Sequence, residues 1–230
     1  IIAHNKLPFC KFTDEMCHDA LTIIIDEAYH AYVAIDYISQ VEKITNIPCV
    51  ALPKETSVTN AVSEVKKILP EKFHLCFDLI AVCIGEHVLT KDLISIGKND
   101  QLDKSFQDVM SDHVYDEGRH SGIFAYILEY LWHKMPVEYK DEIGPSLALF
   151  LTHYLKQDIQ REFDSNILES LDFSDEDRIR ILKDIYVCSN ESAASNPVVI
   201  NLLSLLQRCH ILEHGMTKIA FQEKYELAEA

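Results

Sequence analysis

The sequence predicts an all-α protein, a bundle of long helices that forms one domain over residues 1–230. Hydrophobic residues make up 48% of the chain, while Gly and Pro number only 6 and 7, a balance that is typical of helix-rich globular proteins. Apolar residues recur at spacings of three and four over long stretches, which is the period of one helix face. Most Pro residues stand at the ends of these stretches, so they separate the expected helices from one another.

The first long helix is expected from Thr13 to about Glu42. Thr13 is a suitable N-cap, and the two acidic residues after it complement the dipole of a first helical turn. Asn46-Ile47-Pro48 ends the segment. The apolar positions that indicate the helix are Leu21, Ile24, Ile25, Ala28, Tyr32, Ile35 and Ile38.

Three further helices are expected before residue 135. The first covers about 57–69 and is stopped by Pro70. The second, over 71–94, is so apolar that only its length distinguishes a buried helix from a strand. The third covers 102–134 and is stopped by Pro136.

Two glycines, Gly118 and Gly122, lie inside the expected helix over 102–134. Each costs about 1 kcal/mol of helix stability relative to Ala. We interpret them as positions where another backbone or a substrate comes close to the helix.

The C-terminal part predicts additional helices. Gly144-Pro145 should kink or split the first of them, residues 190–196 should form a polar loop, and a break is expected near 214–215. The expected segments are one that starts at Pro136 or Val137, a helix through 147–163, a helix capped by Ser174 that runs to about Cys188, and a helical region from Pro197 to Glu229.

Charge and cysteine content exclude several classes of protein. The net charge of −16 repels nucleic acid phosphates. No apolar run reaches the roughly 18 residues that a membrane span needs. The seven cysteines are odd in number and form no Cys-x-x-Cys pair, which favours reduced thiols. We therefore expect a cytoplasmic protein without nucleic acid or membrane partners.

Two of the long helices carry a Glu-x-x-His motif. Glu27 and His30 are three residues apart and so share one helix face. His113, Glu117 and His120 follow at i, i+4 and i+7, which places all three along one stripe of a helix. A single such motif arises often by chance on amphipathic helices, but two, each preceded by Asp, are much less expected by chance.

A third helix contributes an isolated carboxylate. Glu86 lies among apolar residues, and a carboxylate buried there without a partner would be very costly. His87 points about 100° away on a helix and is interpreted as an ordinary core or surface histidine. Two Glu-x-x-His helices with a Glu from each of two more helices build a di-iron site in a bundle core, and carboxylate with imidazole suits iron.

The motifs resemble those of a known family. Asp-Glu-x-x-His at 26–30 and Asp-Glu-Gly-Arg-His at 116–120 look like the paired motifs of ferritin-like di-iron oxygenases, and the added His113 resembles the p-aminobenzoate N-oxygenase family. The resemblance covers roughly residues 13–130 and implies a ferritin-like bundle with additional C-terminal helices. It also implies a ligand set of four Glu and three His, of which this chain matches six: Glu27, His30, Glu86, His113, Glu117 and His120.

The seventh ligand of that family is a Glu on a helix that precedes the first motif. Glu15 is about three turns from Glu27 on the same expected helix, which is too far. We therefore expect that this chain lacks an N-terminal helix of the domain.

Charged residues next to the motifs have expected supporting roles. A metal-bound imidazole usually donates its second N–H to a carboxylate. Asp26 and Asp116 are expected to serve the histidines of the opposite helix, and Arg119 is expected to pair with one of these aspartates. The alternative is that all three are ordinary surface charges.

The resemblance implies a monooxygenase that uses two Fe ions, with Mn left open, and O2 to carry an amino group through hydroxylamino towards nitroso or nitro. The sequence has no flavin or nicotinamide fingerprint, so a reductase or ferredoxin is implied as external electron donor. The resemblance also implies a homodimer and a small amine substrate, with an aromatic amine and an aliphatic amine both left open. A carrier-tethered substrate would need a basic patch such as Lys66, Lys67 and Lys72.

Three other functions stay open from the sequence. The first is a di-iron hydroxylase or desaturase that acts on C–H bonds. The second is a ferritin-like iron-binding protein without oxygenase activity. The third is a helical scaffold without metal.

Overall fold

The structure is a computed structural model that describes residues 6–97, 101–186 and 196–225, and for residues 89–97 it describes the backbone alone. Within this part of the chain every regular element is a helix, as predicted. Short 3-10 turns occur at Glu71–Phe73 and Ile211–Glu213. The α-helices are α1 (Asp14–Thr45), α2 (Ser57–Lys66), α3 (His74–Gly97), α4 (Lys104–Lys134), α5 (Val137–Tyr154), α6 (Asp158–Ser170), α7 (Asp175–Ile185), α8 (Pro197–Arg208) and α9 (Gly215–Tyr225).

Local sequence signals explain most helix ends. The side chain of Thr13 accepts a hydrogen bond from the backbone N–H of Met16 at 3.2 Å, and Ser174 caps α7 in the same way through Asp177. Asn46 takes a left-handed conformation (φ 62°) that terminates α1 a few residues later than expected. Both predicted N-caps are therefore confirmed.

Around Pro145 the prediction was wrong. Helix α5 continues through Pro145 without a split, and the expected helix over 147–163 is instead divided between α5 and α6. Packing explains the continuity, since α5 lies against both α2 and α9. At Gly144 the contact with α9 is so close that an added Cβ would lie 1.9 Å from Thr217 Oγ1.

The last helical region is broken twice. His210 takes a left-handed conformation (φ 60°) after α8, and α9 begins at Gly215, where a break was expected. Residues 190–195 of the predicted polar loop, and the predicted helix ends at 187–188 and 226–229, lie outside the described residues.

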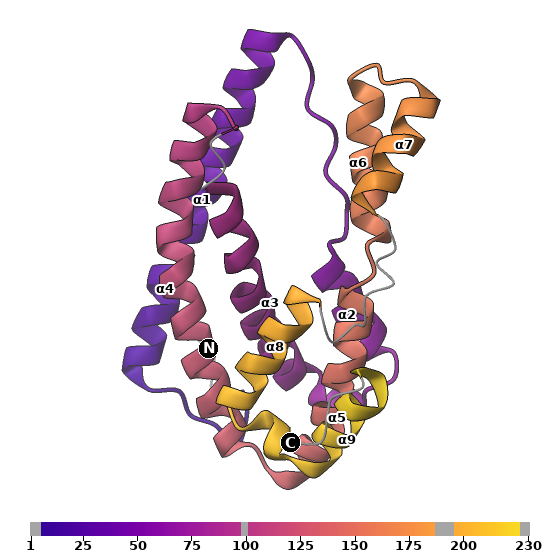
Figure 1. The fold of residues 1–230 in the computed structure, drawn as a ribbon. Coiled ribbons are helices and arrows are strands. Elements are labelled where there is room, and N and C mark those ends of the chain that lie inside the picture. Colours follow the sequence, from indigo (N-terminus) through magenta and orange to yellow (C-terminus); the bar gives the residue numbers. More distant parts are fainter. Residues whose placement is uncertain (1–5, 98–100, 187–195, 226–230) are drawn as a thin grey trace.

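Figure 1 shows the long helices α1 and α4 side by side, with α3 next to α4, while α5, α8 and α9 gather at one end. The hydrophobic core runs from the α3–α4 contact into this end of the molecule. Its largest fully buried side chains include Phe73, Phe77, Ile80, Leu131, Phe150 and Phe221. The arrangement is a ferritin-like bundle with additional C-terminal helices. None of the described helices combines the length and apolarity that crossing a bilayer requires.

One face of α1 is apolar but exposed. We call it the open face of α1 and define it by Leu21, Ile24, Ile25, Tyr32 and Ile35, whose exposed fractions range from 44% to 70%. The spacing that indicated the helix was therefore correct, but these side chains contact little else in the described chain.

Gly118 and Gly122 also lie on an exposed part of α4. A Cβ added at either position would meet nothing within 4 Å among the residues that the structure describes. The close approach that we expected at these glycines is therefore not found there.

Candidate metal centre

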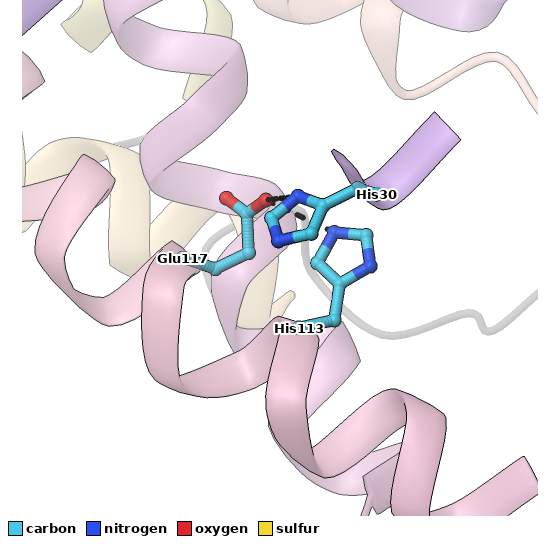
Figure 2. Close-up of side chains that lie close together, drawn as sticks. All are labelled: His30, His113 and Glu117. Atoms are coloured by element: carbon cyan, nitrogen blue, oxygen red, sulfur yellow. Dashed lines mark hydrogen bonds and ion pairs between the residues drawn. The ribbon is translucent and has the colours of Figure 1, made fainter. Parts of the chain in front are cut away.

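Three helices bring the predicted carboxylates and imidazoles together. Glu27 and His30 come from α1, Glu86 comes from α3, and the other three come from α4. Figure 2 shows His30 of α1 next to His113 and Glu117 of α4. One ligand atom from each member lies within 4.8 Å of the others in two groups, which are His30, His113 and Glu117, and Glu27, Glu86, Glu117 and His120.

Two carboxylates lie between the two Glu-x-x-His histidines. His30 Nδ1 is 3.8 Å from Glu27 Oε1 and 3.7 Å from Glu117 Oε1. His120 Nδ1 is 3.2 Å from Glu27 Oε1 and 3.6 Å from Glu117 Oε2. Glu27 and Glu117 thus each lie close to both imidazoles.

The other nitrogen of each imidazole contacts an aspartate of the opposite helix. His30 Nε2 is 3.3 Å from Asp116 Oδ2, and His120 Nε2 is 3.0 Å from Asp26 Oδ2. Arg119 donates to Asp26 and lies 3.8 Å from Asp116. The hydrogen bond with His120 and the contact with Arg119 hold the pKa of Asp26 below its usual range.

The Nδ1 atoms of His30 and His120 provide a test of whether a cation fits. Both are buried and have no hydrogen-bond partner among the described residues. Because Asp26 and Asp116 as carboxylates can only accept, each Nε2 carries a proton, and each Nδ1 faces carboxylate oxygens, an arrangement that a cation bound at Nδ1 would satisfy. Lone pairs and anionic oxygens repel one another unless a cation lies between them. The donor set therefore fits metal ions.

His113 is placed differently from the other two histidines. Its ring stacks on that of His30 with centroids 3.9 Å apart, and its Nε2 is 3.0 Å from Glu117 Oε1. The hydrogen bond with Glu117 raises the pKa of His113. Burial acts to raise the pKa of Glu117, but His113 and the neighbouring imidazoles hold it below the usual value.

Glu86 enters the cluster from the apolar helix α3. It is half-buried, and burial together with the charges of Glu117 and Glu27 raises its pKa to about 7. The next residue, His87, lies 2.6 Å from Ser121 Oγ and is not part of either group. The different directions of these two side chains agree with the sequence interpretation.

A cavity of about 760 Å³ opens beside the cluster, between α1 and α4. We call it the α1–α4 cavity. His30 and His113 form part of its wall, together with Tyr29, Tyr37 and Phe106. The sequence did not identify these aromatic residues as pocket residues, because helical periodicity does not tell which faces of two helices meet.

Paired carboxylate and imidazole side chains at the meeting point of three bundle helices define the class of helical-bundle metal carboxylate proteins. Within this class, residues 10–183 match the family model described as P-aminobenzoate N-oxygenase AurF. The chain belongs to this family of oxygenases, as its motifs predicted. No curated protein and no solved structure matches the chain.

Proposed function

We propose that this protein is a di-iron monooxygenase that activates O2 to oxidise an amine nitrogen, from amino to hydroxylamino, nitroso or nitro. The observation that carries the proposal is the pair of buried Nδ1 atoms, on His30 and His120, that face Glu27 and Glu117 without a hydrogen-bond partner in the described chain. The family supports oxygenase chemistry, and the amine follows from the same membership.

The proposed ligands are the six residues of the two groups, namely Glu27, His30, Glu86, His113, Glu117 and His120. A bound pair of iron ions would supply the electrons and binding positions for O2. In this arrangement Asp26 and Asp116 keep the proton on the outer nitrogen of His120 and His30, which leaves the inner nitrogens free to bind. Arg119 in turn holds Asp26 ionised.

The group around His30 contains one carboxylate, Glu117, whereas the group around His120 contains three. The family resemblance implies a further Glu from another helix. We propose that such a helix packs beside His30 and Glu117, on the side of the centre that holds only one carboxylate. Its carboxylate would complete the ligand set on the His30 side.

Partners outside the chain are inferred from chemistry. Reduction of the metal pair needs an external electron donor, and a reductase or ferredoxin is proposed for this role. We also propose a homodimer in the cytoplasm. The lysines that would receive an acidic carrier are already paired, Lys66 with Asp78, Lys67 with Glu64 and Lys72 with Glu138. A free small-molecule amine is therefore favoured over a carrier-tethered one.

Metal loading and O2 uptake test the proposal. The protein is loaded with Fe(II) without O2, its iron content is measured, and O2 with an aromatic amine is added. We expect about two irons per chain, O2 uptake that depends on the amine, and nitrogen-oxidised products. His113→Ala should reduce both iron content and amine oxidation, while His133→Ala, an exposed histidine on the same helix, should change neither.

Other outcomes select among the alternatives. Oxidation at carbon would identify a hydroxylase or desaturase. Iron uptake and oxidation without amine turnover would identify an iron-binding protein, and the absence of bound iron would leave a helical scaffold. Each of these results contradicts the N-oxygenase proposal.

A further inference from the structure

A second cavity lies beside the α1–α4 cavity, further along α1. The second one, of about 360 Å³, lies between the C-terminal part of α1, the segment after it and α6. Tyr37 and Ile38 line both cavities, so the two cavities lie next to each other at these residues. Figure 1 shows α6 across from this part of α1. The second cavity is lined mainly by apolar side chains, including Val41, Ile47, Val50, Phe163, Ile167 and Leu171.

The two cavities together offer an elongated apolar space that starts at the candidate metal centre. His30 and His113 line its inner end, and Val41 lies in the second cavity. The distance along α1 from His30 to Val41 is about 16 Å at 1.5 Å per residue. Such a space accommodates a molecule considerably longer than a single aromatic ring.

The charges along this space are acidic. Asp108 and Asp112 line the α1–α4 cavity and Glu42 lines the second, while no Lys or Arg lines either cavity in the described part of the chain. Asp108 is paired with Lys104 at the exposed start of α4, and Glu42 accepts the backbone N–H of Cys49 at 2.6 Å. Among the side chains that the structure describes, a carboxylate on a bound molecule would therefore find no Lys or Arg lining these cavities, and burying it unpaired is costly.

We propose that the substrate is an amine with an extended apolar body and no negative charge. Its nitrogen lies at His30 and His113, and its apolar body passes Tyr37 and Ile38 towards α6. The rings of Tyr37 and Phe106, with centroids 5.9 Å apart, form the aromatic part of the wall nearer the metals. The reaction at the nitrogen rests on the proposed function, whereas the selection of the apolar body rests on the cavities alone.

Binding measurements without turnover test whether the cavities prefer an amine with an uncharged apolar body. The protein, with and without Fe(II) and always without O2, is titrated calorimetrically with aniline, 4-hexylaniline and 4-aminobenzoate. We expect 4-hexylaniline to bind at least tenfold more tightly than aniline, because its chain buries apolar surface. We expect 4-aminobenzoate to bind more weakly than aniline.

Two variants of α1 separate the cavity from general effects of charge. Ile38→Arg places a cation where the two cavities lie next to each other. It should weaken the binding of 4-hexylaniline and strengthen the binding of 4-aminobenzoate, each by severalfold. Ile44→Arg is the matched control, since Ile44 lies on the same helix, is 83% exposed and lines neither cavity. It should leave both affinities unchanged.

The results distinguish this proposal from the proposed function. Tighter binding of 4-aminobenzoate than of 4-hexylaniline to the unaltered protein would overturn the substrate proposal, and so would equal effects of the two arginine variants. Oxidation of 4-aminobenzoate with such binding would still support the oxygenase. Conversely, selective binding of 4-hexylaniline without amine-dependent O2 uptake would support the cavity proposal and contradict the oxygenase.

Discussion

At the residue scale, the two Glu-x-x-His histidines depend on charges from the opposite helix. Each outer nitrogen meets an aspartate on the partner helix, at 3.3 Å for His30 and 3.0 Å for His120. This contact fixes the proton on the outer nitrogen and orients the ring, which leaves the inner nitrogen directed at the carboxylates. The aspartates would therefore orient both imidazoles for a metal pair without contacting the metals themselves.

Asp116→Ala should weaken metal binding about 10- to 100-fold, the range usual for loss of a carboxylate that orients a ligating histidine. The reason is that His30 would lose the partner that fixes its proton and its ring. Competition with a chromophoric chelator measures the affinity. Asp184→Ala, an exposed aspartate on α7 far from the two groups, is the control and should have no effect. Equal affinities for Asp116→Ala and unaltered protein would remove the proposed role of Asp116.

The raised pKa of Glu86 predicts that the free energy of unfolding of the metal-free protein depends on pH. Its pKa rises from the ordinary 4.5 to about 7 on folding, so the folded state holds this proton more tightly than the unfolded chain. The resulting contribution to the free energy of unfolding is complete below about pH 4.5 and is lost as the pH rises to about 7. The raised pKa of His113 acts in the same direction.

Glu86→Gln should make the stability of the metal-free protein less dependent on pH between 4.5 and 7. Urea midpoints at several pH values measure this dependence. Glu129→Gln, an exposed position on α4, is the control and should retain the slope of the unaltered protein. An unchanged slope in Glu86→Gln would show that Glu86 titrates normally.

At the element scale, helix caps could be predicted from the sequence, whereas the contacts between helices could not. Thr13 and Ser174 cap helices as expected, because an N-cap depends only on a few neighbouring residues. Pro145 did not split its helix, because contacts of α5 with α2 and α9 are made by residues distant in sequence. Likewise, the open face of α1 has the spacing of a buried stripe without being buried.

The same reasoning applies to the candidate site. The spacing of His113, Glu117 and His120 predicts one stripe of a helix, and the structure places all three in the two groups. That Glu86 meets them was predicted from its apolar neighbours and from the ligand pattern of di-iron bundles, because no spacing relates one helix to another. The cavity residues Tyr37 and Phe106 were missed for this reason. The metal-ligand roles of the six residues stay predictions.

The glycines predict opposite effects of one added methyl group. Gly118→Ala and Gly122→Ala should each stabilise the protein by about 0.5–1 kcal/mol, because Ala favours a helix and the added Cβ meets nothing within 4 Å. Gly144→Ala should destabilise it by about 1–3 kcal/mol, since its Cβ would collide with Thr217. Chemical denaturation measures all three. Destabilisation by Gly118→Ala would instead indicate that another chain or helix packs on this part of α4.

At the scale of the whole molecule, the open face of α1 predicts self-association of the 230-residue chain. Contiguous exposed apolar surface tends to be covered by a partner. Replacing Ile25 and Ile35 by Lys should shift the chain towards the monomer in light scattering at increasing concentration. Replacement of Ile179 and Ile185, which are 68% and 60% exposed on α7, is the control. An identical mass distribution for all variants would show that the open face does not mediate association.

Each imidazole of the candidate centre contacts an aspartate from the opposite helix, so a mutation of one aspartate should alter one side of the centre and not the other. Among the described residues, the imidazole that Asp116 contacts is that of His30, and the imidazole that Asp26 contacts is that of His120. In iron-loaded protein, Asp116→Asn should therefore change one Mössbauer quadrupole doublet, and Asp26→Asn should change the other. These two spectra would assign one doublet to the iron nearer His30 and the other to the iron nearer His120. A substrate that changes only one doublet would then reveal which iron it approaches.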